Sequence, residues 1–407
     1  MENLFAESVV ETYYKGFPLD SYGKKLTQFL ASKPNLFTAD FQFPIMVLKK
    51  SALENNISSM ASFCKSVNAQ LAPHVKTTMS PEIAQLQMQA GAFGLTIANL
   101  WQAQVFLNFG FKRLIIANEV VDPVSIAKIA QLNQSNQAEI FFYIDSMAGL
   151  EIVKTHTPPN GVQNLLIEIG TIDGRGGVRQ LAEVKHLSEI IQSDSRFKLR
   201  GVTGFEGSVP SAARSRKGEK NIIKFCQKIV AAAELIYPSS SNEPFIISAG
   251  GSAYFELVAQ ELNKFNQPKL LLLRSGGYVT HDSKYYEDIY PADVLSARFQ
   301  PAIEVWSQIL STPQTGFGVL NIGKRDVGND LGNPMPIAKF KGSLTTFSGE
   351  IFKLNDQHAY LRSKDNFTVG DLIGLGISHP CTTFDKWRLL PVVNNAYDVV
   401  DCFHTFF

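Results

Sequence analysis

Cysteine is scarce in this chain of 407 residues, and the four that occur, Cys64, Cys226, Cys381 and Cys402, lie far apart. Scattered cysteines form no disulfide framework and are typical of a protein that stays in a reducing compartment. Residues 1–7 contain no basic stretch leading into an apolar one, so we expect no signal peptide. The sequence therefore predicts a cytoplasmic protein.

Long apolar runs and an excess of one charge are absent as well. No run approaches the roughly 18 apolar residues that a membrane helix needs, so we expect no membrane partner. The 38 Lys and Arg residues balance the 37 Asp and Glu residues, and nothing in this balance points to nucleic acid. With 45% hydrophobic and 18% charged residues, the composition is that of a protein with a large core and not of a disordered one.

Short apolar runs alternate with helix-like stretches between residues 70 and 274. The runs are rich in Ile, Leu, Val and Phe and nearly continuous, a pattern typical of parallel strands buried on both faces. Eight strand–helix units fit a (β/α)8 TIM barrel. The predicted strands are residues 70–72, 93–98, 113–117, 139–144, 164–169, 199–205, 244–248 and 270–274, and helices are predicted at 51–65 with Ser51 as N-cap, and at 81–90, 100–108, 181–193 and 217–236.

The C-terminal part of the chain has a different pattern. Its apolar runs are shorter and separated by Gly, Pro, Asn and Asp, which predicts an antiparallel sheet. We expect strands there at residues 305–310, 318–322, 359–362 and 372–376. The predicted domains are a barrel over 49–287 and a C-terminal β domain over 288–407, completed by the N-terminal segment 1–48.

Polar and glycine-rich segments follow several of the predicted barrel strands. In such a barrel the active site lies at the carboxyl ends of the strands. Lys76 follows the first strand, Arg175 the fifth and Glu206 the sixth. We therefore expect these side chains on one rim of the barrel.

Two glycine pairs, Gly250–Gly251 and Gly276–Gly277, follow the seventh and eighth strands. Glycine lets the backbone approach a ligand closely, and exposed backbone N–H groups bind anions. Loops at these positions of a barrel often bind phosphate. Either pair alone is well explained as a tight turn, but their shared position favours a phosphate site.

Lys76 is the candidate reactive residue of this rim. A lysine after a strand is commonly a solvated surface charge. The apolar run before Lys76, and His74 beside it, favour an amine partly withdrawn from water and nucleophilic toward carbonyls. A nucleophilic lysine and a phosphate site on the same rim predict pyridoxal 5'-phosphate as cofactor.

The tripeptide His379-Pro380-Cys381 is the candidate metal motif. Residues two apart in an extended segment point the same way, and imidazole and thiolate together suit Zn²⁺. Two protein ligands leave positions for water or substrate, as in a catalytic site. The alternative is a buried histidine beside a small core cysteine.

Seven segments resemble one known family, in the family's order. They are LAPHVKTTMSP (71–81), residues 91–98 and 167–178, GVTGFEG (201–207), SAGGSAYF (248–255), RSGGYVTHD (274–282) and GISHPCTTFDKW (376–387). The chain resembles the fold-type III pyridoxal-phosphate enzymes, and within them the D-serine dehydratase and D-threonine aldolase group. The resemblance implies a barrel of the alanine racemase N-terminal type, a C-terminal β domain and a homodimer.

The resemblance also implies roles for individual residues. Lys76 matches the Schiff-base lysine and catalytic base. Arg175 matches an arginine near the phenolic oxygen of the cofactor, and Arg274 falls where alanine racemases place an arginine on the pyridine nitrogen. His379 and Cys381 match the zinc pair of the D-serine dehydratases. The further cofactor-binding positions that it implies are Ser248, Gly250, Gly251, Gly276, Gly277 and Tyr278.

The implied activity is that of a lyase. We expect β-elimination from a D-3-hydroxyamino acid, such as D-serine or D-threonine, to a 2-oxo acid and ammonia. D-threonine aldolases usually have aspartate where this chain has Cys381, which favours elimination over retro-aldol cleavage to glycine and an aldehyde. A racemase or decarboxylase with Cys381 as proton donor, and a non-catalytic pyridoxal-phosphate carrier, are more distant alternatives.

One motif departs from part of the family. Eukaryotic D-serine dehydratases tend to have Lys-Thr-His-Lys where this chain has Lys76-Thr77-Thr78-Met79. The difference shifts the resemblance toward the bacterial branch of amino-acid deaminases and leaves the substrate side chain open.

Overall fold

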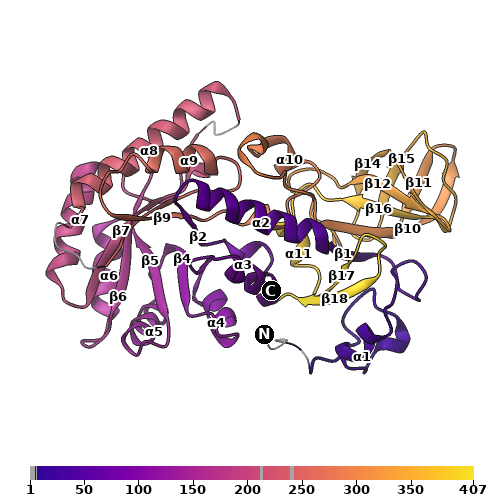
Figure 1. Cartoon of the computed structure of the whole chain (residues 1–407), viewed down its shortest axis with the longest axis horizontal. Helices are drawn as coiled ribbons and strands as arrows, with labels where there is room; N and C mark the ends of the chain where they lie inside the picture. The colour runs from indigo at the N-terminus through magenta and orange to yellow at the C-terminus, as the bar shows by residue number, and fades with distance from the viewer. Residues whose placement is uncertain (1–4, 6, 211–213, 239–242) are drawn as a thin grey trace.

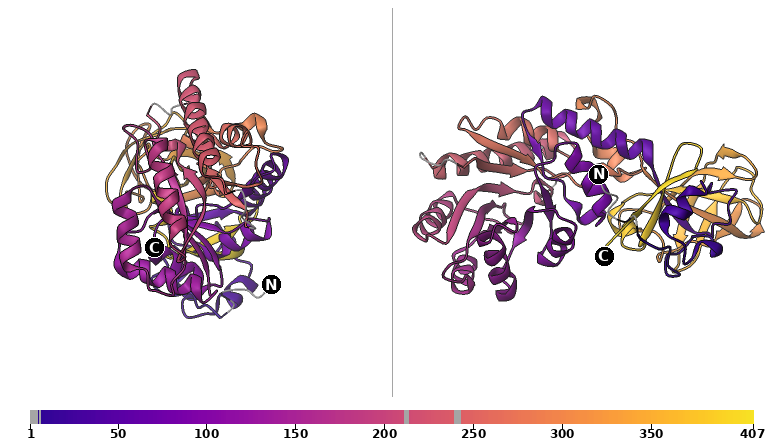
Figure 2. Two further views of the ribbon diagram at one scale, coloured as in Figure 1. Left: turned by 90° about the vertical axis from the view of Figure 1, so that its left-hand side faces the viewer. Right: turned by 60° about the horizontal axis from the view of Figure 1, so that its bottom comes forward.

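The computed structural model of the chain describes residues 5, 7–210, 214–238 and 243–407. A barrel and a β domain lie side by side, and helix α2 (Lys50–Ser66) extends along both (Figures 1 and 2). Eight parallel strands form the barrel in the order β2–β9–β8–β7–β6–β5–β4–β3. Their bounds are β2 Gln70–Leu71, β3 Leu95–Ile97, β4 Arg113–Glu119, β5 Glu139–Ile144, β6 Gln163–Ile169, β7 Phe197–Gly204, β8 Phe245–Ala249 and β9 Lys269–Leu273.

The sheet closes on itself between its first and last strands. The Phe93 amide donates to the Leu71 carbonyl at 2.8 Å, and the Thr96 amide donates to the Pro73 carbonyl at 2.9 Å. Closure leaves no exposed sheet edge. The predicted barrel is thereby confirmed.

The barrel strands are buried on both faces. Seven side chains form an apolar cluster inside the barrel, separate from the larger cluster that the outer helices share with the β domain. The inner cluster consists of Ala72, Ile115, Phe141, Tyr143, Leu166, Ile246 and Leu272. Two apolar environments explain why the strands appear as nearly continuous apolar runs.

Helices surround the barrel, and side-chain caps begin several of them. The N-caps that accept a hydrogen bond from the first turn are Ser80, Asn99, Asp122, Ser146 and Ser215. The helices are α3 Pro81–Gln89, α4 Leu100–Asn108, α5 Pro123–Gln134, α6 Met147–His156, α7 Leu181–Ser193, α8 Arg216–Ile236 and α9 Phe255–Leu262. The predicted cap of α2 is wrong: the helix begins at Lys50, and the Ser51 hydroxyl donates to Asn395 at 2.9 Å.

The second domain is a mostly antiparallel sheet in the order β13–β12–β16–β10–β1–β17–β18, with β11, β15 and β14 extending from β10. Strand β1 (Ile45–Lys49) lies between β10 and β17, so the N-terminal segment and the C-terminal region share one sheet. The other bounds are β10 Ile303–Gln314, β11 Phe317–Leu320, β12 Met335–Phe340, β13 Leu344–Thr346, β14 Glu350–Leu354, β15 Ala359–Arg362, β16 Leu372–Gly376, β17 Leu389–Val393 and β18 Val399–His404.

Two short helices flank this sheet. Helix α1 (Leu26–Ala31) packs beside β18, and the Val399 amide donates to the Pro34 carbonyl at 2.8 Å. Helix α10 (Tyr285–Ile289) follows β9, and the predicted domain boundary between residues 287 and 288 falls within it.

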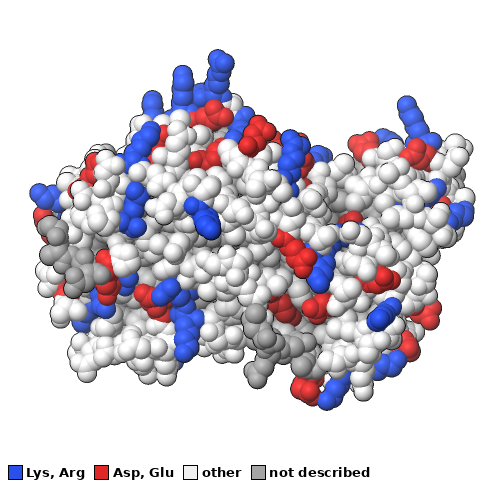
Figure 3. Space-filling model, in the orientation of Figure 1, with Lys and Arg blue, Asp and Glu red and all other residues white. Residues whose placement is uncertain are grey.

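The face of the molecule in Figure 3 carries both signs of charge on both domains. Within the described part of the chain, none of the helices combines the length and apolar character that crossing a bilayer requires.

We predict that Asn56 is a main anchor between α2 and the connection from barrel to β domain. Its buried amide donates to the carbonyls of Val279 (3.2 Å) and Gln300 (2.8 Å) and accepts from the Gln300 amide (2.7 Å). Asn56→Ala leaves these buried groups without partners, so the free energy of unfolding should fall by about 2–4 kcal/mol. Denaturant unfolding measures the change, with Ser58→Ala on the exposed face of α2 as control. Equal stability of the two variants would contradict the prediction.

Candidate active site

One cavity of about 270 Å³ lies where the carboxyl ends of the barrel strands face the β domain. Lys76, Arg175, Arg274 and both glycine pairs line it from the barrel, and His379 and Cys381 line it from the β domain. The structure thus brings together most of the residues that the sequence singled out.

Lys76 lies in a short 3-10 turn, Val75–Thr77, between β2 and α3. Its side chain is exposed, so the expected withdrawal from water is not observed. The neighbouring His74 is different: burial, reinforced by Lys76, Arg274 and Arg175, holds the pKa of its imidazole well below the usual range. A neutral His74 adds no charge beside the Lys76 amine.

Arg274 lines the cavity with a buried side chain. It is 5% exposed, and its guanidinium donates to the Thr203 hydroxyl (2.9 Å) and to the Gly204 carbonyl (2.6 Å). It also donates to the Ser248 hydroxyl. Ser248 therefore holds Arg274 and is not among the residues that line the cavity. All of these partners are neutral, so the positive charge of Arg274 remains available to a ligand.

Arg175 comes from the loop after β6 and is held by a carboxylate. Its Nη2 lies 2.8 Å from Oε1 of the buried Glu168. Burial, together with Glu168, raises the pKa of the adjacent Glu119 to about 8. The ionised form of Glu119 is disfavoured beside Glu168, and Glu168 is the carboxylate that contacts Arg175.

At the second glycine pair the backbone lies close to the backbone of His74. A side chain at Gly276 would place its Cβ 2.3 Å from the His74 carbonyl oxygen, so only glycine fits there. Among the described residues, no acceptor lies on the amides of Gly276 or Gly277. Two unpaired amides beside Lys76 fit the phosphate of pyridoxal phosphate.

The first glycine pair has a partner already. Gly250 adopts φ +109°, which favours glycine, and its amide donates to Glu206 Oε2 at 2.9 Å. The Gly251 amide donates to Glu206 Oε1. This turn therefore binds a carboxylate of the protein itself.

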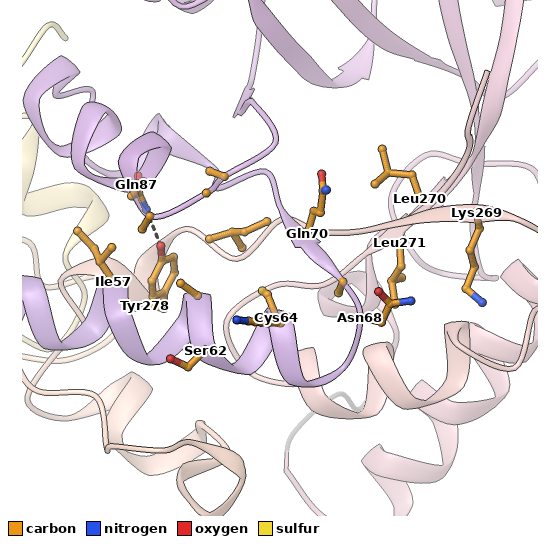
Figure 4. A pocket seen from close by; sticks show the side chains of 17 residues that line it. Ile57, Ser62, Cys64, Asn68, Gln70, Gln87, Lys269, Leu270, Leu271 and Tyr278 are labelled. Atoms are coloured by element: carbon orange, nitrogen blue, oxygen red, sulfur yellow. Dashed lines mark hydrogen bonds between the residues drawn. The ribbon is translucent and has the colours of Figure 1, made fainter. Parts of the chain in front are cut away.

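Tyr278 points away from the cavity. Its buried hydroxyl accepts from Gln87 Nε2 at 2.8 Å, beside a second cavity of about 550 Å³ next to α2 (Figure 4). Because the 3-10 turn Gly277–Val279 directs the ring toward α3, Tyr278 lies near the phosphate turn in sequence but does not face the same cavity.

The metal motif differs from the predicted extended segment. Pro380 is helical and Cys381 begins the short helix α11 (Cys381–Phe384), yet both His379 and Cys381 line the cavity. His379 Nδ1 lies 2.7 Å from Asp330 Oδ2, and Cys381 Sγ lies 3.3 Å from the Thr77 hydroxyl.

These contacts fit a metal ligand. When Nδ1–H donates to Asp330, the Nε2 lone pair is free to coordinate, which is the usual outer-shell arrangement of a ligating histidine. Burial lowers the pKa of His379, but Cys381 and Asp330 outweigh burial and raise it to about 9. A divalent cation here would displace that proton.

Other residues of the site were missed by the sequence analysis. Phe205, Ser252 and Tyr286 line the cavity, and the Tyr286 ring lies 6.2 Å from the His379 ring. Asp330 comes from the loop between β11 and β12. Ser252 lies within the quoted SAGGS segment and could have been found, whereas Tyr286 and Asp330 carry no motif signal.

Comparison with known proteins agrees with this geometry. The family profile described as "Alanine racemase, N-terminal domain" matches residues 48–268, and that described as "Putative serine dehydratase domain" matches residues 302–393. D-threonine aldolase of Arthrobacter sp is 26% identical over 87% of this chain and 89% of its own.

Two solved structures have the same fold. D-threonine aldolase from Filomicrobium marinum superposes with a TM-score of 0.76 at 22% identity, covering 90% of this chain and 95% of that one. A metal-free variant of D-threo-3-hydroxyaspartate dehydratase gives a TM-score of 0.75 at 19% identity, covering 92% and 99%. The first profile spans more than half of the chain, and the chain therefore belongs to the alanine racemase N-terminal domain family, among the fold-type III pyridoxal-phosphate enzymes related to D-threonine aldolase and D-serine dehydratase.

Proposed function

We propose that the chain is a pyridoxal-phosphate- and metal-dependent lyase that eliminates the β-hydroxyl of a D-3-hydroxyamino acid. The observation that carries the proposal is the single cavity in which Lys76 of the barrel faces His379 and Cys381 of the β domain. Elimination needs a base at Cα and a group that assists departure of the hydroxyl, and the two sides of this cavity supply one each.

The barrel side suits the cofactor. Lys76 would hold the aldehyde carbon, the Gly276 and Gly277 amides the phosphate, and Arg175 and Arg274 the ring. When bound, pyridoxal phosphate supplies an electron sink for the charge left at Cα. The Lys76 amine would serve as general base for the α-proton of the substrate.

The β-domain side suits a divalent ion, for which a nitrogen and a sulfur donor favour zinc. His379 and Cys381 would bind it, with Asp330 orienting the imidazole. Bound there, the ion supplies Lewis acidity for the departing hydroxyl. In the dehydratase structures, one variant replaces a cysteine and is described as metal-free, and another replaces a histidine two positions earlier, which is the spacing found here.

The net conversion balances. For D-serine, the α-proton and the β-hydroxyl leave as water, and hydrolysis of the released enamine consumes one water and yields pyruvate and ammonia. Retro-aldol cleavage is the second candidate, because the curated relatives include D-threonine aldolase and 3-hydroxy-D-aspartate aldolase. Elimination is preferred because Cys381 stands where aldolases of this group usually have aspartate.

We predict that Lys76 carries the cofactor covalently. Protein purified with pyridoxal phosphate should be yellow, and borohydride reduction followed by peptide mapping should place the label on Lys76. Lys76→Ala should lose both label and activity, whereas Lys185→Arg, at an exposed position of α7, should retain both. A label on another lysine would overturn the assignment.

We predict that one divalent ion per chain is needed for the reaction and not for the fold. Removal of the ion by a chelator, or Cys381→Ala, should abolish elimination. Asp330→Ala should lower the affinity for the metal by about 10–100-fold. Metal analysis, activity and thermal unfolding together measure these effects. The unfolding midpoint should stay nearly unchanged, and His358→Ala, at an exposed histidine of the β domain, is the control. Full turnover by the metal-free protein would favour Cys381 as a proton donor or a packing residue instead.

We predict that D-serine and D-threonine yield 2-oxo acids and ammonia and that the L-enantiomers do not react. Product identification by mass spectrometry on D-serine, D-threonine and D-3-hydroxyaspartate decides between the two reactions. Glycine and acetaldehyde from D-threonine, with little 2-oxobutanoate, would show that aldol cleavage is the activity.

A further inference from the structure

The two glycine turns of the cavity have different partners. The first, Gly250–Gly251, directs both amides at the carboxylate of Glu206, one oxygen to each amide. The second, Gly276–Gly277, directs its amides at no acceptor within the described residues. Two turns that look equivalent in sequence therefore offer an incoming anion different sites.

Glu206 carries a buried carboxyl group whose side-chain partners are backbone amides. It is 1% exposed and lies in the 3-10 turn Glu206–Ser208, which is separated from β7 by Phe205 alone. Among the ion pairs of the described residues none includes Glu206, so the two amides are the partners of its carboxyl oxygens. Hydrogen bonds of this kind stabilise an ionised carboxylate.

A phosphate at the same turn would meet two obstacles. It would have to displace both hydrogen bonds of Glu206, and the buried carboxylate would repel it at close range. A Cβ at Gly251 would lie 3.0 Å from Glu206 Oε1 and 3.3 Å from the Phe205 ring, so the carboxylate fills the space against this turn. The second turn has neither obstacle.

The two turns are also connected. The Ser275 hydroxyl donates to the Gly251 carbonyl at 2.6 Å, and Ser275 directly precedes Gly276. A series of hydrogen bonds thus runs from Glu206 at the end of β7, through Gly251 after β8, to the phosphate turn after β9. The position of Glu206 therefore affects the backbone on which the free amides lie.

We propose that Glu206 is a positioning residue for the cofactor: its carboxylate braces the first glycine turn and directs the phosphate to the amides of Gly276 and Gly277. The inference rests on the proposed pyridoxal-phosphate cofactor and concerns its binding, not the reaction. In the opposite case, the Glu206 carboxylate occupies the first turn only until the phosphate displaces it, and the expected change in cofactor affinity has the opposite sign.

Glu206→Gln tests the proposal on the apo protein. The glutamine side chain has nearly the same shape, but its NH₂ would face an amide donor, so one of the two hydrogen bonds to the first turn is lost. Dissociation constants of pyridoxal phosphate and of pyridoxal, which lacks the phosphate, are measured by absorbance titration. We expect about a tenfold loss of affinity for pyridoxal phosphate, the scale of one hydrogen bond to a charged group, and little change for pyridoxal. Glu189→Gln, an exposed carboxylate on α7, is the control.

Each other outcome overturns the proposal. Tighter binding of pyridoxal phosphate would show that Glu206 competes with the phosphate for the first turn. Equal losses of affinity for both compounds would indicate a merely structural role. Unchanged affinities would show that Glu206 has no part in cofactor binding. Glu206→Asp keeps the charge and should retain more of the phosphate-dependent affinity than the glutamine variant.

Hydrogen exchange on the unmodified protein gives a readout that needs no variant. The Gly250 and Gly251 amides should be protected before the cofactor is added, and new protection on its addition should be confined to Gly276 and Gly277. New protection at the first turn instead would contradict the proposed role of Glu206. Failure of the wild-type protein to bind pyridoxal phosphate at all would count against the proposed function, not against the role of Glu206.

Discussion

Strand β1 passes through the middle of the β-domain sheet and continues into barrel helix α2 without an intervening residue. Because β1 is paired on both sides, the start of the barrel is fixed relative to the sheet. The chain returns to the β domain after β9, and the buried Asn56 of α2 binds this second connection at Val279 and Gln300. Two crossings joined by one helix restrain relative movement of the domains. That restraint allows one cavity to combine a lysine from one domain with a histidine and a cysteine from the other.

The cationic side chains of the cavity differ in whether they have an anionic partner. Arg175 is paired with Glu168, whereas Arg274 has neutral partners and Lys76 has no carboxylate on its amine among the described residues. His74 stays neutral beside them. A site with uncompensated positive charge suits a ligand that brings a phosphate and a carboxylate. The buried Glu206 carboxylate lies at the first glycine turn, where it accepts from both amides, whereas the amides of the second turn have no acceptor among the described residues.

The sequence predicted the elements better than the details of the site. Strands buried on both faces are recognisable from continuous apolar runs, and the helices at 100–108 and 181–193 were predicted to the residue. The predicted side-chain contacts were less reliable. Ser51 resembles an N-cap, but α2 begins at Lys50, and its N-cap position falls on Lys49, the last residue of β1. Tyr278 was expected at the cofactor because of its sequence position, but a 3-10 turn directs it to Gln87. Tyr286 and Asp330 reach the site only through tertiary folding, which no local pattern records.

The set of bases in the cavity bears on the choice between the two lyase reactions. Elimination requires a proton to be taken from Cα, and Lys76 suits that position. Retro-aldol cleavage requires a proton to be taken from the β-hydroxyl, on the side where His379 and Cys381 lie. If both of these bind a metal, the remaining polar side chains there are the hydroxyls of Thr77, Ser252 and Tyr286, and hydroxyl groups are poor bases near neutral pH. The proposed elimination therefore fits this set of side chains better than retro-aldol cleavage does.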